Sequence, residues 1–282
     1  MFFNKFKDSF EESPLIITSP HSGKIYPQSF LQNLESDISY CKSIEDMFVD
    51  EIIYDVRKLG ISLLINNYSR AVFDVNRDIS EIDISLIDLL DNFEISETLK
   101  VKSGIGLIPT QTSMGKIEFK KKFNNTEFNF LVNMIYRNWH KKLGQLIQLK
   151  KKELNRVFII DCHSMPSDLS GNFNIPDIVL GNCDNKSCDT KVLNFLKNEF
   201  EKKGYYVSLN HPYSGGFITQ KYYNQKASTQ TLQIEINKKL YLDEQKFIKN
   251  ENFDNLKKDF LGIIEKFSKI FDNRKKETFA AE

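Results

Sequence analysis

Short apolar runs alternate along the chain with longer segments in which apolar residues recur at helical spacing. Six of the short runs predict strands, because they are rich in β-branched residues and bounded by turn residues. They span residues 14–19, 61–67, 156–161, 177–182, 205–210 and 231–237. Four longer segments predict helices, at roughly 44–59, 125–150, 187–203 and 243–271. Strands that alternate with helices favour a layered α/β fold with a mainly parallel sheet.

Nothing along the chain marks a domain boundary. The sequence contains no internal repeat, no linker rich in proline, glycine or serine, and no low-complexity tract. A chain of 282 residues is long enough to bury one large core. We therefore predict a single domain over residues 1–282.

Composition and net charge indicate which kinds of partner the protein is suited to bind. The hydrophobic content of 40% and the charged content of 27% are near the average for globular proteins. A net charge of +1 provides no basic field for nucleic acid or a membrane surface. The charge therefore argues against a nucleic-acid or membrane partner and is compatible with a small neutral or anionic substrate, while the oligomeric state stays open.

The cellular compartment is predicted from the cysteines and the amino terminus. The four cysteines form no CxxC pair and no disulfide-dense pattern, which fits a reducing compartment. The amino terminus is too charged for a signal peptide, and the chain has no run of about 18 apolar residues. Both features predict a cytoplasmic protein.

Two of the four histidines follow predicted strands: His21 in SPHSG and His163 in DCHSMP. Ligands of such sheets collect beyond the carboxyl ends of strands. Neutral imidazole is a common zinc ligand, and a catalytic zinc typically takes three protein ligands and a water. Glu45, Asp46 and Asp50, in IEDMFVDEI, are candidates for the third ligand. The alternative is that each histidine only hydrogen-bonds a backbone carbonyl.

Glu235 lies on the polar face of the last predicted strand, TLQIEIN. A polar stripe of this kind is usually a solvated strand face. In a sheet covered on both sides, however, a carboxylate facing a cavity could take a proton from zinc-bound water and return it to a leaving amine. Glu235 is therefore a candidate general base.

The segment SRAVFDVNRD concentrates polar groups after predicted strand 61–67, among them Arg70, Asn76 and Arg77. The planar guanidinium of arginine matches a carboxylate with two parallel hydrogen bonds, so this segment is a candidate anchor for an acidic substrate. The alternative is an exposed loop of alternating charge.

The turn SGGFITQ is a further candidate for ligand contact. Its paired glycines, Gly215 and Gly216, allow a ligand to approach the backbone closely, and Thr219 follows them. A simple loop explains the same residues.

Taken in order, these motifs resemble the N-formylglutamate amidohydrolase family over roughly residues 13–241. The motifs are SPHSG, the segment IEDMFVDEI, SRAVFDVNR, the Trp139 and His140 pair, DCHSMP, SGGFITQ and QTLQIEIN. The resemblance implies a three-layer α/β fold like that of zinc carboxypeptidases, with a mixed, mostly parallel central sheet flanked by helices. It also implies a zinc-dependent amidohydrolase, in which another divalent metal can replace zinc.

The resemblance further implies a role for each candidate residue. Zinc would be held by His21, Asp46 and His163, and Glu235 would be the general base. The substrate carboxylate would be held by Arg70, Asn76 and Arg77, with Arg70 also serving as a donor to the oxyanion. The remaining substrate contacts would be His140, Gly215, Gly216 and Thr219.

The implied substrate is a small N-acyl amino acid, with N-formylglutamate, which yields formate and glutamate, as the first candidate. Two alternatives stay open: a peptidase similar to metallo-carboxypeptidases, and a homologue that binds a ligand without turnover.

Overall fold

The computed structural model describes residues 3–6, 13–88, 93–168, 174–226 and 228–277. The chain separates into two compact units, each assembled from several stretches of sequence. Unit 1 comprises Met1–Asn4, Pro20–Met47 and Ile65–Gly144. Unit 2 comprises Lys5–Ser19, Phe48–Leu64 and Gln145–Glu282.

The main sheet has seven strands in the order β1-β3-β2-β8-β11-β9-β10. Strand β8 pairs parallel with both β2 and β11, β10 pairs parallel with β9, and β11 pairs antiparallel with β9. The sheet is thus mixed, as predicted. Its strands are β1 (Phe3–Phe6), β2 (Leu15–Ser19), β3 (Ser62–Asn66), β8 (Val157–Met165), β9 (Ile178–Gly181), β10 (Val207–Leu209) and β11 (Thr229–Asn237).

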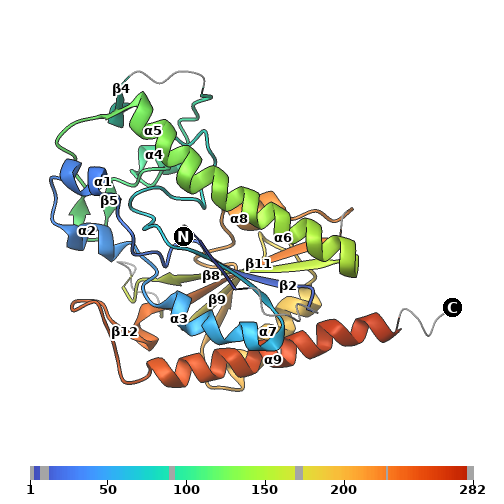
Figure 1. The fold of residues 1–282 in the computed structure, drawn as a ribbon. Helices are drawn as coiled ribbons and strands as arrows, with labels where there is room; N and C mark the ends of the chain where they lie inside the picture. The colour runs from blue at the N-terminus through green and yellow to red at the C-terminus, as the bar shows by residue number, and fades with distance from the viewer. Residues whose placement is uncertain (1–2, 7–12, 89–92, 169–173, 227, 278–282) are drawn as a thin grey trace. The chain divides into compact units, whose positions relative to one another are not determined.

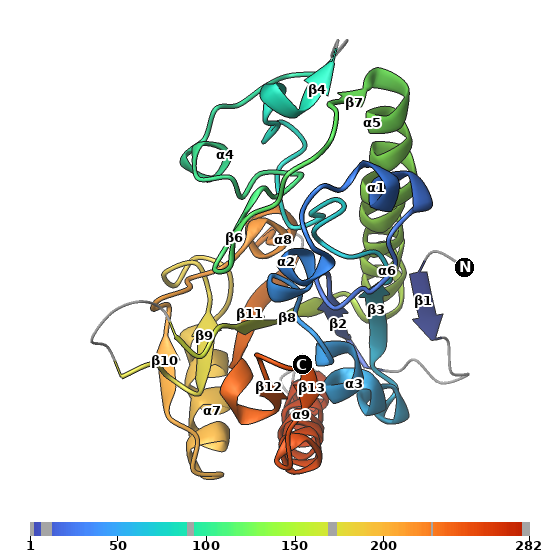
Figure 2. The same cartoon turned by 90° about the vertical axis from the view of Figure 1, so that its left-hand side faces the viewer.

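Helices cover the part of this sheet that belongs to unit 2 on both faces (Figures 1 and 2). One face carries α3 (Val49–Ile53), α7 (Thr190–Glu201) and α9 (Phe253–Glu277). The other face carries α8 (Phe217–Tyr222) and the end of α6 (Asn138–Leu154). Because both faces are covered, β2, β3, β8 and β9 are buried along their whole length, which explains their continuous apolar runs.

Unit 1 contains short helices and long loops. A capping box starts α5 (Asn125–Leu131), where the side chains of Asn124 and Glu127 each accept the other residue's backbone N–H. The other described helices of unit 1 are α1 (Gln28–Asn33), α2 (Ile38–Ser43), a 3-10 helix (Ile84–Leu86), α4 (Leu99–Lys102) and a π-helical turn (Val132–Arg137) that leads into α6. The short strands are β4 (Ile87–Asp88), β5 (Gln111–Thr112), β6 (Gly115–Lys116) and β7 (Phe123–Asn124).

The helix predicted over 243–271 begins later than its apolar pattern indicates. Residues Leu242–Asp243 and Ile248–Lys249 pair instead as a small hairpin, β12 and β13. The side chain of Asp243 accepts the backbone N–H groups of Gln245 and Lys246, which stabilises a turn rather than a helix. Ile248 is consequently 52% exposed.

Other boundaries also differ from the predicted ones. The strand predicted over 156–161 continues to Met165, so His163 lies within β8 rather than after it. The helix predicted from residue 44 starts at Val49 and continues from Tyr54 to Leu59 as a 3-10 helix. Among the described residues, no helix combines the length and the apolar character needed to cross a membrane.

Candidate active site

Unit 1 buries His21 two residues after β2, with only 2% of the residue exposed. Its Nε2 lies 2.7 Å from Oδ1 of Asp74. Its Nδ1 lies 3.5 Å from Oδ2 of Asp46, whose backbone N–H donates to the carbonyl oxygen of His21 over 3.0 Å. A carboxylate on one ring nitrogen fixes the tautomer and orientation of the ring, an arrangement typical of histidines that bind a metal through the other nitrogen.

Asp74 joins His21 to the predicted substrate arginines. Its Oδ2 accepts a hydrogen bond from Nη2 of Arg70 at 2.7 Å, and Nε of Arg77 lies 4.0 Å from the same oxygen. Its Oδ1 accepts the backbone N–H of Asn76 at 2.8 Å. Burial alone would raise the pKa of Asp74, but attraction to His21 and the two arginines outweighs it and holds the pKa well below its ordinary value. Asp74 is therefore ionised, and we call it the hub of unit 1 because its one carboxylate contacts His21, Arg70 and Arg77.

Glu45 and Asp46, although adjacent, face different partners. Glu45 accepts a hydrogen bond from the hydroxyl of Tyr26. Burial and the charge of Glu45 both raise the pKa of Tyr26, which keeps the phenol protonated as a donor. Asp46, in contrast, faces His21. The other carboxylate considered from the sequence, Asp50, lies in α3 of unit 2.

The segment that carries Asn76 and Arg77 is tied to the long helix of unit 1. Nε2 of His140 lies 3.1 Å from the carbonyl oxygen of Val75. The hydroxyl of Tyr136 donates to the carbonyl oxygen of Arg77 at 3.0 Å. Tyr136 lies in the π-helical turn, and its ring centroid is 4.3 Å from that of His140. Such turns are rare and frequently occur at functional sites.

Unit 2 buries His163 within β8, beside Asp161. The two side chains share one face of the strand because they are two residues apart. Nε2 of His163 lies 2.9 Å from Oδ2 of Asp161, and Thr18 donates its hydroxyl to Oδ1 of the same carboxylate at 2.5 Å. Asp161 is therefore compensated by two buried partners, and it orients His163 as Asp74 orients His21.

Glu235 lies beside His163 in the sheet, because the register of β8 and β11 pairs their Cα positions. The residue is only 8% exposed. Its Oε1 accepts a hydrogen bond from Nε2 of Gln233 at 2.7 Å. The polar stripe of β11 is thus buried rather than solvated.

The glycine turn lies at the start of α8, a helix that packs on β11. Gly215 has a φ of 147°, and a Cβ atom there would lie 2.6 Å from Sγ of Cys183, so both the backbone angle and the space require glycine. Gly216 is the N-cap residue of α8. Thr219 is fully buried, and its carbonyl oxygen accepts the hydroxyl of Thr231 at 2.6 Å.

The sequence model of the N-formylglutamate amidohydrolases matches residues 13–242. The chain belongs to this family. The resemblance predicted from the ordered motifs is thereby confirmed.

Individual relatives agree with this membership. An N-formylglutamate deformylase of Pseudomonas putida is 25% identical over 238 residues, which cover 82% of each protein. A crystal structure of an N-formylglutamate amidohydrolase from Ralstonia eutropha JMP134 superposes with a TM-score of 0.90 at 26% identity, over 96% of this chain and 99% of that one. A gene product of Agrobacterium tumefaciens, at 15% identity and a TM-score of 0.69, covers 98% and 96% of the two chains and shares the fold. The predicted α/β fold, a mixed central sheet flanked by helices, is confirmed.

The contacts of three side chains of this family member appear only in the structure. Asp74 appears in the sequence as one charge of an alternating segment, yet it contacts a histidine 53 positions away. Asp161 precedes His163 by two residues, so strand alternation was the signal that could have identified their contact. Gln233 precedes Glu235 by the same spacing and carries the same signal.

Proposed function

We propose that the protein is a metal-dependent amidohydrolase that cleaves N-formylglutamate to formate and glutamate. The observation that carries this proposal is the family match over residues 13–242, together with curated relatives named N-formylglutamate deformylase. One match runs through stretches of both compact units, which supports a single catalytic domain over the chain. We retain the prediction that the enzyme acts in the cytoplasm.

The metal ligands in this proposal are His21, Asp46 and His163. All three are buried and of types that bind zinc or another divalent ion. Each histidine has its Nε2 beside a buried carboxylate, the arrangement expected around a metal-bound imidazole. The donor set therefore fits zinc.

Glu235 is the proposed general base. It would take a proton from the attacking water and deliver it to the amide nitrogen as the carbon–nitrogen bond breaks, so that formate and the free amine of glutamate result. Its hydrogen bond from Gln233 holds the carboxylate in one orientation. A bound divalent metal would polarise the amide carbonyl and lower the pKa of a bound water to about 7.

The arginine segment is the proposed site for the substrate carboxylates. Arg70 and Arg77 are positioned by their contacts with Asp74, which reduces the ordering needed when an anion binds. Arg70 would also donate to the oxyanion. Asn76, His140 and the turn of Gly215, Gly216 and Thr219 complete the proposed substrate contacts.

The test is metal analysis of purified variants combined with an assay of formate release. We expect His21→Ala and His163→Ala each to lose bound zinc and activity. Glu235→Ala should keep its zinc and lose turnover. His211→Ala, an exposed histidine, is the matched control and should resemble the wild type in both measurements.

Zinc content and product release together distinguish the proposed deformylase from a peptidase and from a non-catalytic homologue. Normal zinc content in both variants of the predicted ligands would refute the ligand assignment. Release of a carboxy-terminal residue from a short peptide, with N-formylglutamate left intact, would favour a peptidase. Ligand binding without any release of product would favour a non-catalytic homologue.

A further inference from the structure

The hydroxyl of Tyr26 joins two segments of unit 1 that lie far apart in the sequence. It donates a hydrogen bond to Oε1 of Glu45 and accepts one from the hydroxyl of Ser69. The oxygen of Ser69 in turn accepts the backbone N–H of Ala71 at 3.2 Å. Both hydroxyls thus donate in one direction and accept in the other, so that hydrogen bonds run without a break from Ala71 to Glu45.

The partners of Tyr26 are removed from water. Glu45 is 2% exposed, and Ser69 is fully buried. Removal of a donor from a buried carboxylate is costly, because water cannot replace it. The ring of Tyr26 packs near that of Phe30, with 5.9 Å between the centroids, and this contact helps to direct the hydroxyl. The link from Glu45 through Tyr26 to Ser69 is therefore well defined.

The residue that follows each partner belongs to the candidate site. Asp46, a proposed metal ligand, follows Glu45, and Arg70, a proposed substrate contact, follows Ser69. Consecutive Cα atoms are only about 3.8 Å apart, so a shift of Glu45 or Ser69 also moves its neighbour. A bond that holds Glu45 and Ser69 in place therefore also holds the backbone of Asp46 and Arg70.

The loop that carries Tyr26 contacts both segments through its backbone as well. Ile25 donates its N–H to the carbonyl oxygen of Asn67 at 2.9 Å, and its own carbonyl oxygen accepts the N–H of Ser69 at 3.1 Å. At the start of the loop, the carbonyl oxygen of His21 accepts the N–H of Asp46 at 3.0 Å. Tyr26 adds a side-chain link between two segments that this loop already contacts.

We propose that Tyr26 is a positioning residue, which holds the segments of Asp46 and Arg70 at the separation needed to bind metal and substrate together. It acts through Glu45 and Ser69 rather than by contact with either ligand. This role rests on the proposed function, because that proposal assigns Asp46 to the metal and Arg70 to the substrate carboxylate.

Two affinities of the variant Tyr26→Phe test the proposal. This change removes the hydroxyl and keeps the ring that packs near Phe30. We expect the zinc affinity, measured by competition with a chelating indicator, to fall about tenfold. At saturating zinc, the Kd of glutarate, a dicarboxylate probe of the arginine segment, should rise about tenfold in isothermal titration calorimetry. A residue with a merely structural role would lower the melting temperature without changing these affinities.

Ser69→Ala separates the two halves of the link. The bond from Tyr26 to Glu45 stays in place, so the zinc affinity should stay near the wild-type value while the Kd of glutarate rises. In the double variant Tyr26→Phe/Ser69→Ala, this Kd should be no higher than in Ser69→Ala alone, because the link is already broken. Additive effects of the two substitutions on the Kd of glutarate would overturn the link.

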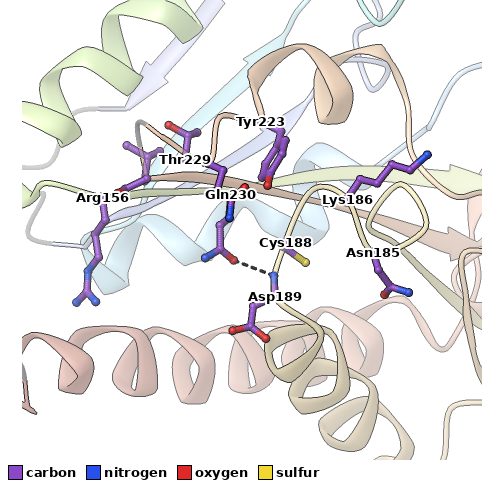
Figure 3. A pocket seen from close by; sticks show the side chains of 11 residues that line it. Arg156, Asn185, Lys186, Cys188, Asp189, Tyr223, Thr229 and Gln230 are labelled. Carbon is purple, nitrogen blue, oxygen red and sulfur yellow. Dashed lines mark hydrogen bonds between the residues drawn. The ribbon is translucent and has the colours of Figure 1, made fainter.

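Two other half-buried tyrosines control for the loss of a phenolic hydroxyl. Tyr40 lies on α2 of unit 1. Tyr223 lines a cavity of about 520 Å³ in unit 2, at the amino-terminal ends of β8 and β11, and points toward Gln230 (Figure 3). Tyr40→Phe and Tyr223→Phe should keep the wild-type affinities for zinc and glutarate. A tenfold loss in either control would show a general effect of removing a hydroxyl and would overturn the specific role of Tyr26.

The outcomes distinguish this proposal from the proposed function, because neither affinity depends on turnover. Wild-type affinities in Tyr26→Phe, with formate release intact in the wild type, would overturn the positioning role alone. A change in one affinity without the other would overturn the link between the two segments. Absence of formate release in the wild type, with both affinities reduced in Tyr26→Phe, would overturn only the deformylase proposal.

Discussion

The site residues of the two units are held in place by different forces. His163 and Glu235 lie on neighbouring strands, where backbone hydrogen bonds of the sheet set their positions. His21 lies on a loop, where side-chain contacts with Asp74 and Asp46 set its position. In unit 1, the carboxylate of Asp74 alone contacts His21, Arg70 and Arg77 and so positions several site residues. In unit 2, the backbone pairing of the strands positions His163 and Glu235.

Replacement of the unit 1 hub should have the largest effect. Asp74→Asn leaves Arg70 and Arg77 without their buried counter-charge, so we expect about 3 kcal/mol of lost stability. The metal affinity should fall roughly 10–100-fold because His21 loses its carboxylate, and KM should rise because the arginines lose their anchor. Urea unfolding, metal competition and steady-state kinetics measure the three effects.

Asp37→Asn is the matched control for this variant, because it changes an exposed aspartate of unit 1 and keeps a residue that caps α2. A loss of stability in Asp74→Asn no larger than the roughly 0.5 kcal/mol of a surface substitution would contradict the role of Asp74 as a hub.

The equivalent change in unit 2 should affect metal affinity but not substrate binding. Asp161→Asn should lower the metal affinity roughly 10–100-fold. KM should stay near the wild-type value, because the partners of Asp161 among the described side chains are His163 and Thr18 rather than an arginine. The same competition assay measures the affinity, with the exposed Asp254→Asn as control. A rise in KM equal to that of Asp74→Asn would remove the difference between the two units.

Gln233→Ala should affect the proposed base alone. A hydrogen bond to a charged group contributes about 1.5 kcal/mol, so kcat should fall about tenfold. Zinc content should stay unchanged, since Gln233 contacts Glu235 rather than a proposed metal ligand. The exposed Gln148→Ala is the control on α6. An unchanged kcat would show that the strand alone orients Glu235.

At the glycine turn we expect an effect on stability without a loss of the metal site. Gly215→Ala combines an unfavourable φ with a close approach to Cys183, and should cost about 1 kcal/mol in unfolding free energy. Gly262→Ala, at a helical position with open space around its Cα, should instead stabilise by about 0.5–1 kcal/mol. Equal shifts of both melting temperatures in the same direction would contradict the strain at residue 215.

The sequence predicts the strand-borne part of the molecule better than the loop-borne part. Each of the six predicted strands overlaps a strand of the sheet. In β2, β3, β8 and β9, burial on both faces explains the apolar run that predicted the strand. The contact of His21 with Asp74 has no such local signal, since the loop conformation that joins them depends on contacts between distant residues. The hairpin at residues 242–249 was missed because Asp243 stabilises a turn within an apolar pattern of helical spacing.

Some features of the candidate site could be predicted from the sequence, and others could not. Family motifs and strand ends identified His21, His163 and Glu235 as candidates, and the structure buries all three. They did not identify the π-helical turn at Tyr136, because a single wider turn leaves the apolar periodicity of a long helix almost unchanged.

The strand order has a consequence for synthesis on the ribosome. Strand β11 lies between β8 and β9, yet it is the last strand of the sheet to be made. Until residue 237 has emerged, the nascent chain has a gap at the centre of its sheet, and β8 and β9 each expose an unpaired edge. Edges of this kind favour aggregation, so the newly made chain should need protection by chaperones until β11 has been made and has paired with both neighbours.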